Sequence, residues 1–307
     1  MARGLSSTIE QWAEVPDISA RSVLVTIIGD TLVPIGSSIW VSQMLRLSEC
    51  FGFTDRLVRT SMNRLVAEDW LYTERVGRQS RYHMTELAFA ESAQASQRIY
   101  GVEDPDWSGD WVLLFLPTTL PAPEFSRIRE HFSWNGFVPV SSRVLAAPGV
   151  KPESARELMQ LVDQNVRPVI ATATFTELTE LVEDGFFIAE SDSDDLAAAY
   201  LGFVDRYGPV HSSVVAKPKG IEPIDAFGLR TMLVHDLRRI RLRWPELPVQ
   251  ARPADWPGDR AAEIAATLYE STVARSSEWL SSVFDLEYPN ALPTRFAPSY
   301  DPHTERP

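Results

Sequence analysis

Apolar residues recur at helical spacing through the first hundred residues, and short polar breaks separate these segments. The pattern predicts three helices, which cover residues 20–33, 43–51 and 55–70. Their predicted N-cap residues are Asp17 or Ser19 for the first helix, Ser42 for the second and Thr54 for the third. A very short strand is predicted at residues 39–41, between the first two helices, and Gly52 is predicted to end the second helix.

A strand-like alternation follows the third helix. The predicted hairpin consists of residues 71–76, a turn at 77–79 and residues 80–84. Thr85 then caps a helix that reaches about Tyr100. The order helix, short strand, helix, turn, helix, hairpin, helix is that of a winged helix-turn-helix, so residues 19–100 are predicted to bind DNA. Residues 1–18 are polar and aperiodic, and we expect a flexible arm there.

A second pattern runs through residues 107–176. Four apolar segments are predicted to be strands, over residues 111–117, 136–140, 143–149 and 166–175. Two amphipathic helices are predicted, opened by Pro123 and Pro152 and covering residues 124–135 and 153–164. The order β-α-β-β-α-β is the plan of the ferredoxin-like fold, which we interpret here as a scaffold for dimerisation.

The rest of the chain is mostly helical, and residues 177–285 are predicted to form a C-terminal domain. Its predicted helices cover residues 176–187, 195–208, 224–244 and 260–284. Two loops are predicted, one marked by Pro209, Pro218 and Pro223 and the other over residues 246–259. Residues 286–307 form a Pro-rich tail that should be extended or disordered. The predicted fold class is therefore α+β, with three domains.

Composition excludes several classes of protein. The chain has 307 residues, of which 44% are hydrophobic and 23% charged, as in soluble globular proteins. The best apolar run, residues 23–28, is far shorter than the ~20 residues a membrane-crossing helix needs. The N-terminus lacks the apolar segment of a signal peptide, and a single cysteine, Cys50, excludes an intrachain disulfide. We therefore expect a cytoplasmic protein with no membrane partner.

The charge distribution is uneven. The net charge of −13 argues against nucleic-acid binding by the molecule as a whole. Residues 20–100, however, carry nine Arg and eight acidic residues, so this segment is locally able to dock on phosphate groups.

The third helix carries the candidate DNA-reading residues. On a helical wheel, Leu57, Val58, Ser61 and Leu65 form a buried stripe with Met62 just beyond it. The opposite face and the helix ends present residues that pair with base edges or phosphates: Thr54, Arg56, Arg59, Thr60, Asn63 and Arg64. Arginines placed at the hairpin tip are expected to hold phosphates: Arg75, Arg78 and Arg81. The alternative is a solvated helix face with a charged turn, and the helix-turn-helix setting favours the DNA interpretation.

The chain resembles the PaaX family, the repressors of bacterial phenylacetate catabolism. The similar residues are spread over nearly the whole length, in residues 58–85, 109–117, 136–148 and 229–259. The last of these, with its His-plus-Arg helix and its Pro-Ala-Asp-Trp-Pro-Gly loop, is the most specific. The resemblance implies a homodimeric transcriptional repressor that binds operator DNA. Its three domains would be a winged helix, a ferredoxin-like dimerisation module and a helical C-terminal domain. It also implies release from DNA by phenylacetyl-coenzyme A.

A cluster on the helix at 224–244 is the candidate effector site. Arg238 and Arg241 share one helix face, and Arg239 and Arg243 share another. Such a cluster suits the phosphates of an acyl-coenzyme A thioester, and Trp244 and Trp256 suit its ring or acyl part. The alternative is a charged helix face with Arg paired to nearby acids and tryptophans packed in the domain. For His235, a buried structural hydrogen bond is favoured over ligand contact.

Motifs for catalysis or metal binding are missing from the sequence. Neither a nucleophile elbow, nor a Walker loop, nor a dinucleotide-binding glycine pattern is present, and no His or Cys spacing suits zinc. We therefore expect that the protein is not an enzyme and holds no cofactor or metal. We expect it to repress transcription sterically and to leave the DNA when a ligand binds. Two alternatives stay open: a ligand-independent DNA-binding regulator, and an RNA-processing or protein-interaction module built on the ferredoxin-like core.

Overall fold

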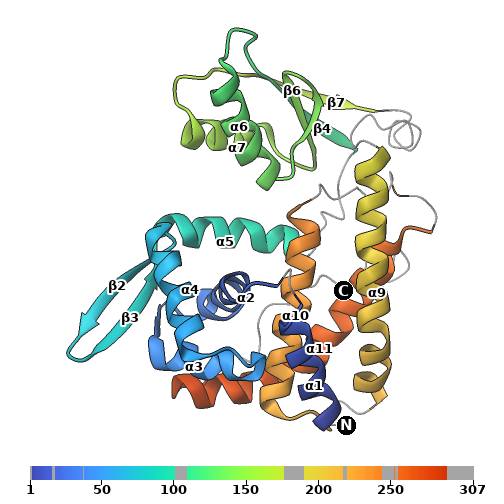
Figure 1. Ribbon diagram of the computed structural model, residues 1–307. Coiled ribbons are helices and arrows are strands. Elements are labelled where there is room, and N and C mark those ends of the chain that lie inside the picture. The colour runs from blue at the N-terminus through green and yellow to red at the C-terminus, as the bar shows by residue number, and fades with distance from the viewer. Residues whose placement is uncertain are drawn as a thin grey trace, which may run out of the picture. The chain divides into compact units, whose positions relative to one another are not determined.

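The computed structural model describes residues 2–15, 18–36, 38–100, 109–175, 190–216, 220–243, 252 and 255–288 (Figure 1). The chain divides into two compact units. The first combines Met1–Gly101, Phe203–Arg239 and Ala261–Pro307, and the second combines Val102–Gly202 and Ile240–Arg260. The described residues mix helices with two small antiparallel sheets, which confirms the α+β prediction. No helix among these residues is long and apolar enough to span a lipid bilayer.

The N-terminal segment is a helix and not the flexible arm that was predicted. Helix α1 spans Ala2–Ala13. Ile9 and Trp12 are buried, and Leu5 is half-buried one turn before Ile9. Positions 5, 9 and 12 lie on one helix face, so a narrow apolar stripe was overlooked within a polar composition.

Helix α2 begins where the sequence predicted and ends irregularly. It spans Ala20–Ile27, and its N-cap Ser19 accepts a hydrogen bond from the Ser22 amide. The chain continues through a π-helical turn at Ile28–Leu32 and a 3-10 turn at Val33–Ile35. Nothing in the sequence pattern indicated the π turn, although such turns often occur at functional sites.

The other elements of this segment follow the predicted order. They are β1 (Ser38–Trp40), α3 (Val41–Ser48), a 3-10 turn (Glu49–Phe51), α4 (Asp55–Ala67), β2 (Leu71–Val76), β3 (Gln79–Met84) and α5 (Glu86–Ile99). Thr54 and Thr85 are N-caps as predicted, whereas α3 begins at Val41 with Trp40 and not Ser42 as its N-cap. The three strands form an antiparallel sheet in the order β1-β3-β2.

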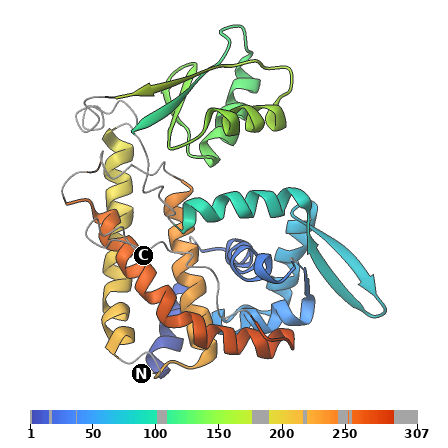
Figure 2. The same cartoon turned by 180° about the vertical axis from the view of Figure 1, so that it is seen from behind.

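The middle of the chain also has the predicted element order. Its elements are β4 (Asp110–Phe115), α6 (Ala122–Trp134), β5 (Val138–Ser141), β6 (Val144–Pro148), α7 (Pro152–Val162) and β7 (Val169–Thr174). The strands form an antiparallel sheet in the order β5-β6-β4-β7. Apolar residues of α6 and α7, such as Phe132 and Met159, pack with Leu114 and Leu145 of the sheet, so both helices cover the same face (Figure 2).

Three long helices follow. They are α9 (Glu190–Ala216), α10 (Pro223–Arg241) and α11 (Pro257–Phe284). Pro209 lies inside α9, so the prediction of a loop that starts there is wrong. Proline has no backbone N–H, and a helix of 27 residues tolerates the loss of that one hydrogen bond. The helix predicted at 176–187, most of the loop at 246–259, and tail residues 289–307 lie outside the described residues. At the start of the tail, Tyr288 is buried and its hydroxyl donates to the Thr31 carbonyl over 2.7 Å.

Candidate DNA-binding surface and the helices behind it

Helix α4 presents the predicted face to solvent. Thr54 and the residues proposed to read DNA are all exposed: Arg56, Arg59, Thr60, Asn63 and Arg64. The buried residues are Val58, Ser61, Met62 and Leu65. Leu57, which was assigned to the buried stripe, is 44% exposed. The helices α2 and α3 contact α4. The buried stripe on α4 is narrower than the helical wheel predicted, because it does not include Leu57.

Thr54 has a structural role in addition to its place beside the exposed face. Its side-chain oxygen accepts a hydrogen bond from the Leu57 amide over 3.3 Å, so it caps the helix. Asp55 follows in the first turn, where an acidic side chain is favourable to the helix dipole.

The β2–β3 hairpin extends outwards beside α4 (Figure 1). Gly77, with a φ of 61°, and Arg78 form its turn, and Arg75 is exposed one register pair below the end of the ladder. Arg81 does not belong to the tip. Its guanidinium donates to the Ser38 hydroxyl over 2.7 Å and lies 5.5 Å from the ring centroid of Trp40. Arg81 therefore joins β3 to β1, which leaves Arg75 and Arg78 as the tip arginines.

The C-terminal end of α4 is tied to two neighbours. Glu68, the C-cap residue, forms an ion pair with Arg21 of α2, whose Nε donates over 2.9 Å. Asp69 follows with a φ of 56°, and its carbonyl accepts a hydrogen bond from the Thr85 hydroxyl over 2.8 Å. The end of α4 is thus held against α2 on one side and against the base of the hairpin on the other.

His235 is a buried connector between α10 and α2. Its Nε2 lies 3.1 Å from the Ser22 hydroxyl and its Nδ1 lies 3.3 Å from Asp236. Burial holds the pKa of His235 below its usual value, which favours the neutral ring. In that form Nδ1–H donates to Asp236 and Nε2 accepts from Ser22. In this arrangement His235 is fully buried and both of its ring nitrogens are hydrogen-bonded within the protein.

Arg238 turns toward the same serine. Its guanidinium donates to the Ser22 hydroxyl over 2.7 Å and to the Ser22 carbonyl over 3.2 Å. Burial, together with the positive charges of Arg21 and Arg239, lowers the pKa of Arg238 to about 10. Arg238 is thus engaged with α2 and is turned away from bulk solvent.

Asp236 is a functional candidate that the sequence analysis missed. Besides His235, its carboxylate accepts hydrogen bonds from Trp12 over 3.2 Å, Arg206 over 2.6 Å and Tyr207 over 3.0 Å. Burial by itself raises the pKa of Asp236, but the hydrogen bond from His235 and the charge of Arg206 outweigh it and hold the pKa below its ordinary value. One buried carboxylate therefore joins α1, α9 and α10.

A second buried carboxylate, Asp30, lies in the π-helical turn. Arg230 of α10 donates to it over 2.7 Å, and the two side chains are 0% and 3% exposed. The hydroxyls of Tyr100 and Tyr269 also donate to Asp30. The guanidinium of Arg230 lies 4.9 Å from the ring centroid of Tyr269 and donates to Ser276. The sequence did hold a signal, because Asp30 is the one charged residue between Val23 and Val33.

The remaining effector candidates do not converge on one surface. Arg239 and Arg243 are exposed, whereas Arg241 is buried. Trp256 is buried with its ring centroid 5.9 Å from that of Tyr200, and Trp244 lies outside the described residues. Arg239 lies on α10, whereas Arg243 lies beyond the end of that helix at Arg241, so the pair does not share a helix face.

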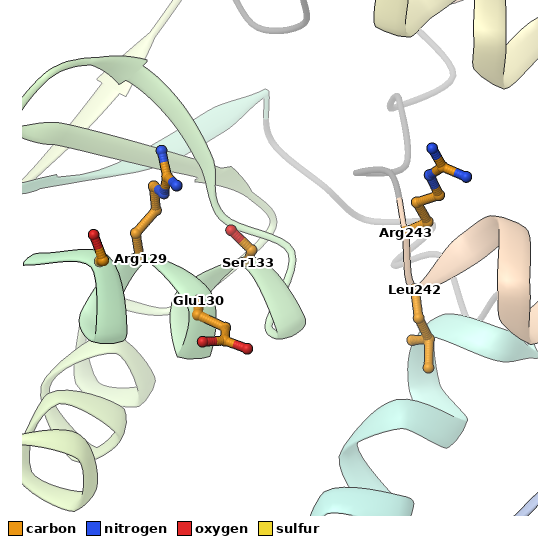
Figure 3. A pocket seen from close by; sticks show the side chains of 6 residues that line it. Arg129, Glu130, Ser133, Leu242 and Arg243 are labelled. Atoms are coloured by element: carbon orange, nitrogen blue, oxygen red, sulfur yellow. The ribbon is translucent and has the colours of Figure 1, made fainter. Parts of the chain in front are cut away.

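Arg243 and Leu242 also line a pocket of about 410 Å³ with residues of α6. In Figure 3 the side chains of Arg129, Glu130 and Arg243 point in different directions and meet at no common point. The pocket therefore offers no assembled set of ligand contacts. Across the part of the chain that the structure describes, no group of three or more His, Cys, Asp or Glu side chains is placed to hold a metal ion.

Comparisons with known proteins point to one family. Residues 19–88 match the family model described as PaaX-like protein, and residues 192–282 match the model of the PaaX-like protein C-terminal domain. The chain is 27% identical over 299 residues to the Transcriptional repressor PaaX of Escherichia coli (strain K12), which covers 94% of this chain and 93% of that protein. Among solved structures, an uncharacterized protein from Mycobacterium tuberculosis is similar with a TM-score of 0.50 and 19% identity, covering 84% of this chain and 97% of that one. At that identity the structural likeness concerns the fold alone.

Proposed function

Because the chain belongs to the PaaX-like protein family, we propose that it is a cytoplasmic transcriptional repressor that binds double-stranded DNA through α4 and the β2–β3 hairpin. The family is one of regulators and not of enzymes. The observation that carries the proposal is the exposed face of α4, where Arg56, Arg59, Thr60 and Asn63 stand beside a hairpin with Arg78 in its turn. These side-chain types pair with base edges and phosphates.

The two sheets support the finer fold assignment. The order of helices and strands from α2 to α5, with a sheet ordered β1-β3-β2, fits a winged helix-turn-helix. The order β5-β6-β4-β7, with α6 and α7 on one face, fits a ferredoxin-like module. On this assignment α4 is the recognition helix and β2–β3 is the wing.

Two arginines test the division between base reading and phosphate contact. Arg59→Ala should weaken binding to a selected duplex by roughly 1–3 kcal/mol and relax the base preference at one position of each half-site. Arg78→Ala should weaken binding to every duplex and lower the salt slope by about one unit for each wing. Binding titrations on selected and scrambled duplexes measure both effects, with the exposed Arg156→Ala as a control on α7. Identical sequence profiles for Arg59→Ala and Arg78→Ala would contradict the assignment.

The proposed repressor acts as a homodimer through residues 107–176. One winged helix reads few base pairs, so specific affinity calls for two half-sites. Phe115 and Val169 pair across β4 and β7 and are 40% and 66% exposed, which offers an apolar surface for a second copy. Sedimentation of the full chain should show a dimer, and Val169→Asp should shift it to monomer. A monomeric wild-type chain would exclude this assembly.

The proposed effector is an aryl-acyl-coenzyme A such as phenylacetyl-coenzyme A, as the family resemblance implies. His235 and Arg241 are buried and Arg238 donates to Ser22, so Arg239 and Arg243 are the exposed arginines of this cluster. The thioester has several phosphates for them to clamp, whereas free phenylacetate has one charge.

Release can be measured by gel shift. Phenylacetyl-coenzyme A should weaken DNA binding about 5–150-fold, the range of typical allosteric coupling, and phenylacetate should not. The double variant Arg239→Ala/Arg243→Ala should bind DNA normally and no longer respond. A normal response from that variant places the ligand elsewhere, and a wild-type chain that ignores the thioester is a ligand-independent regulator.

A further inference from the structure

Helix α10 is attached to α2 at two separate points. Arg238 reaches Ser22 near the start of α2, and Arg230 reaches Asp30 in the π-helical turn. Ser22 and Asp30 are eight residues apart in the sequence, and so are Arg230 and Arg238. Eight residues correspond to about 12 Å along a helix axis. Two contacts at that separation fix the orientation of α2 on α10, whereas a single contact would leave α2 free to pivot.

The contact at Ser22 uses every hydrogen-bonding group of that side chain. The hydroxyl donates to His235 over 3.1 Å and accepts from Arg238 over 2.7 Å. The Ser22 carbonyl accepts a second hydrogen bond from Arg238. Ser22→Ala removes the hydroxyl and so takes one hydrogen-bond partner from each of two side chains of α10, His235 and Arg238, which is costly away from water.

The contact at Asp30 is more deeply buried and involves more helices. Arg230, at 0% exposure, pairs with Asp30, at 3% exposure. Tyr100, at the end of α5, and Tyr269 of α11 donate to the same carboxylate. The contact at Ser22 is therefore the one that can be altered without removing the counter-charge of a fully buried ionic group.

Helix α2 in turn contacts α4. Arg21, the neighbour of Ser22, forms the ion pair with Glu68 at the C-terminal end of α4. The first turn of α2 thus contacts α10 through Ser22 and α4 through Arg21. One helical turn of α2 therefore lies between α10 and the helix whose exposed face carries Arg59 and Asn63.

We propose that α10 positions the DNA-reading helix α4 through α2, and that Ser22 is the positioning residue. The inference rests on the proposed DNA-binding function and adds how the C-terminal helices act on it. Base contacts depend on the orientation of α4, while phosphate contacts by the hairpin tolerate small rotations. Loosening Ser22 should therefore reduce discrimination between DNA sequences more than it reduces overall affinity. Any ligand that shifts α10 would act on DNA binding by the same path.

The test compares Ser22→Ala with Tyr207→Phe in the full-length protein. Tyr207→Phe also removes one buried hydrogen bond of α10, but toward Asp236 and α9 and not toward α2. The probe is a duplex selected by the wild-type protein from a random pool, beside a scrambled duplex of the same composition. Ser22→Ala should lower the ratio of the two affinities at least about fivefold, the low end of typical coupling. Tyr207→Phe should lower the thermal stability about as much as Ser22→Ala does, and should leave the ratio of the two affinities unchanged.

Arg238→Lys supplies a second variant if Ser22→Ala does not fold. It keeps the positive charge and removes the forked donor that reaches Ser22, so it should lower the ratio in the same direction. An unchanged ratio in the folded Ser22 or Arg238 variant would overturn the proposal, as would an equal fall in Tyr207→Phe. Failure of the proposed function looks different, because the wild-type protein would then select no duplex at all.

Discussion

Each of the two units contains an Arg–Asp pair with an N···O distance of 2.7 Å, yet the two pairs differ in surroundings. Arg230 and Asp30, in the first unit, are 0% and 3% exposed, whereas Arg127 and Asp163, in the second, are 44% and 16% exposed. Equal geometry does not mean equal energetic consequence. A buried pair loses its hydration and depends on its partners, while water and salt screen an exposed pair.

The contrast extends to the cores of the two units. The core between α6, α7 and the four-stranded sheet consists of apolar residues such as Val112, Ile128 and Phe132. The first unit places Asp30 and Asp236 among its buried residues, and each accepts hydrogen bonds from several helices. Apolar packing tolerates many arrangements, whereas a carboxylate with three or four donors specifies one.

The largest effect is expected from Arg230→Met. The substitution leaves Asp30 buried without its counter-charge, and removing one partner of a buried pair costs about 3–5 kcal/mol. Chemical denaturation that follows the unfolding of the first unit should show this loss in its free energy of unfolding. The double variant Asp30→Asn/Arg230→Met removes both charges and should recover most of it. If the double variant is less stable than Arg230→Met, the charge of Asp30 is not what the arginine compensates.

The next largest effect is expected from Phe132→Ala in the second unit, which should lower the free energy of unfolding by up to about 3–5 kcal/mol. The mechanism differs from that of Arg230→Met. Phe132 is fully buried and packs edge-on against Phe137 at a centroid distance of 4.9 Å. The cost comes from lost burial and from the cavity, so Phe132→Leu should cost less in proportion to volume. Calorimetry should show the transition of the second unit lowered and that of the first unit unchanged. Equal costs for the two substitutions would argue against a cavity origin.

A pH effect, smaller than the loss for Arg230→Met, is expected from His235. Its pKa in the folded protein is lowered from 6.5 by burial, so the unfolded chain binds the proton more readily. The stability that neutral His235 contributes is therefore present above pH 6.5 and is lost as the pH falls below that value. The pKa of Asp236 lies below its ordinary value, so Asp236 stays ionised in this window. His235→Gln should flatten the dependence of unfolding free energy between pH 7 and pH 5, and an unchanged slope would contradict the prediction.

The smallest effect is expected from Arg127→Met. Arg127 donates to Asp163 and to the Val162 carbonyl, and its side chain is 44% exposed. Exposed pairs contribute about 0.2–1 kcal/mol, and salt screens them. The cost should shrink further in high salt, whereas that of Arg230→Met should not. A salt-independent cost above 2 kcal/mol, on the order of a buried pair, would remove the distinction between the two pairs.

Local signals predicted most of the fold. Thr54 and Thr85 were recognised as helix caps, and the six elements of the middle segment were found in their order, because caps, turns and apolar periods act over a few residues. Helix α1 was missed because its stripe is thin and the partner of Trp12 lies 224 residues away. Leu57 was misplaced because the wheel shows which side chains share a face, and not how wide the covering helices are.

The exposed face of α4 was also predictable, since amphipathicity separates its two sides. The partners of the charged residues were not. Arg238 was assigned to a ligand, yet its structural partner is Ser22, 216 positions earlier in the chain. Nothing in a local window tells whether an arginine will meet a phosphate or another helix, because that choice is made by tertiary packing.

The first unit is built from three separate stretches of chain, and this has a consequence for synthesis. A ribosome releases residues 1–101 long before residues 203–239 and 261–307 exist, so Asp30 emerges with neither Arg230 nor Tyr269 to meet it. The segment from Asp110 to Thr174 is continuous and can fold as it emerges. A chain that stops before α10 therefore has a complete four-stranded sheet with its two helices and an incomplete first unit. Only a chain translated into α11 can bury Asp30 with all three of its donors, because Tyr269 belongs to that helix.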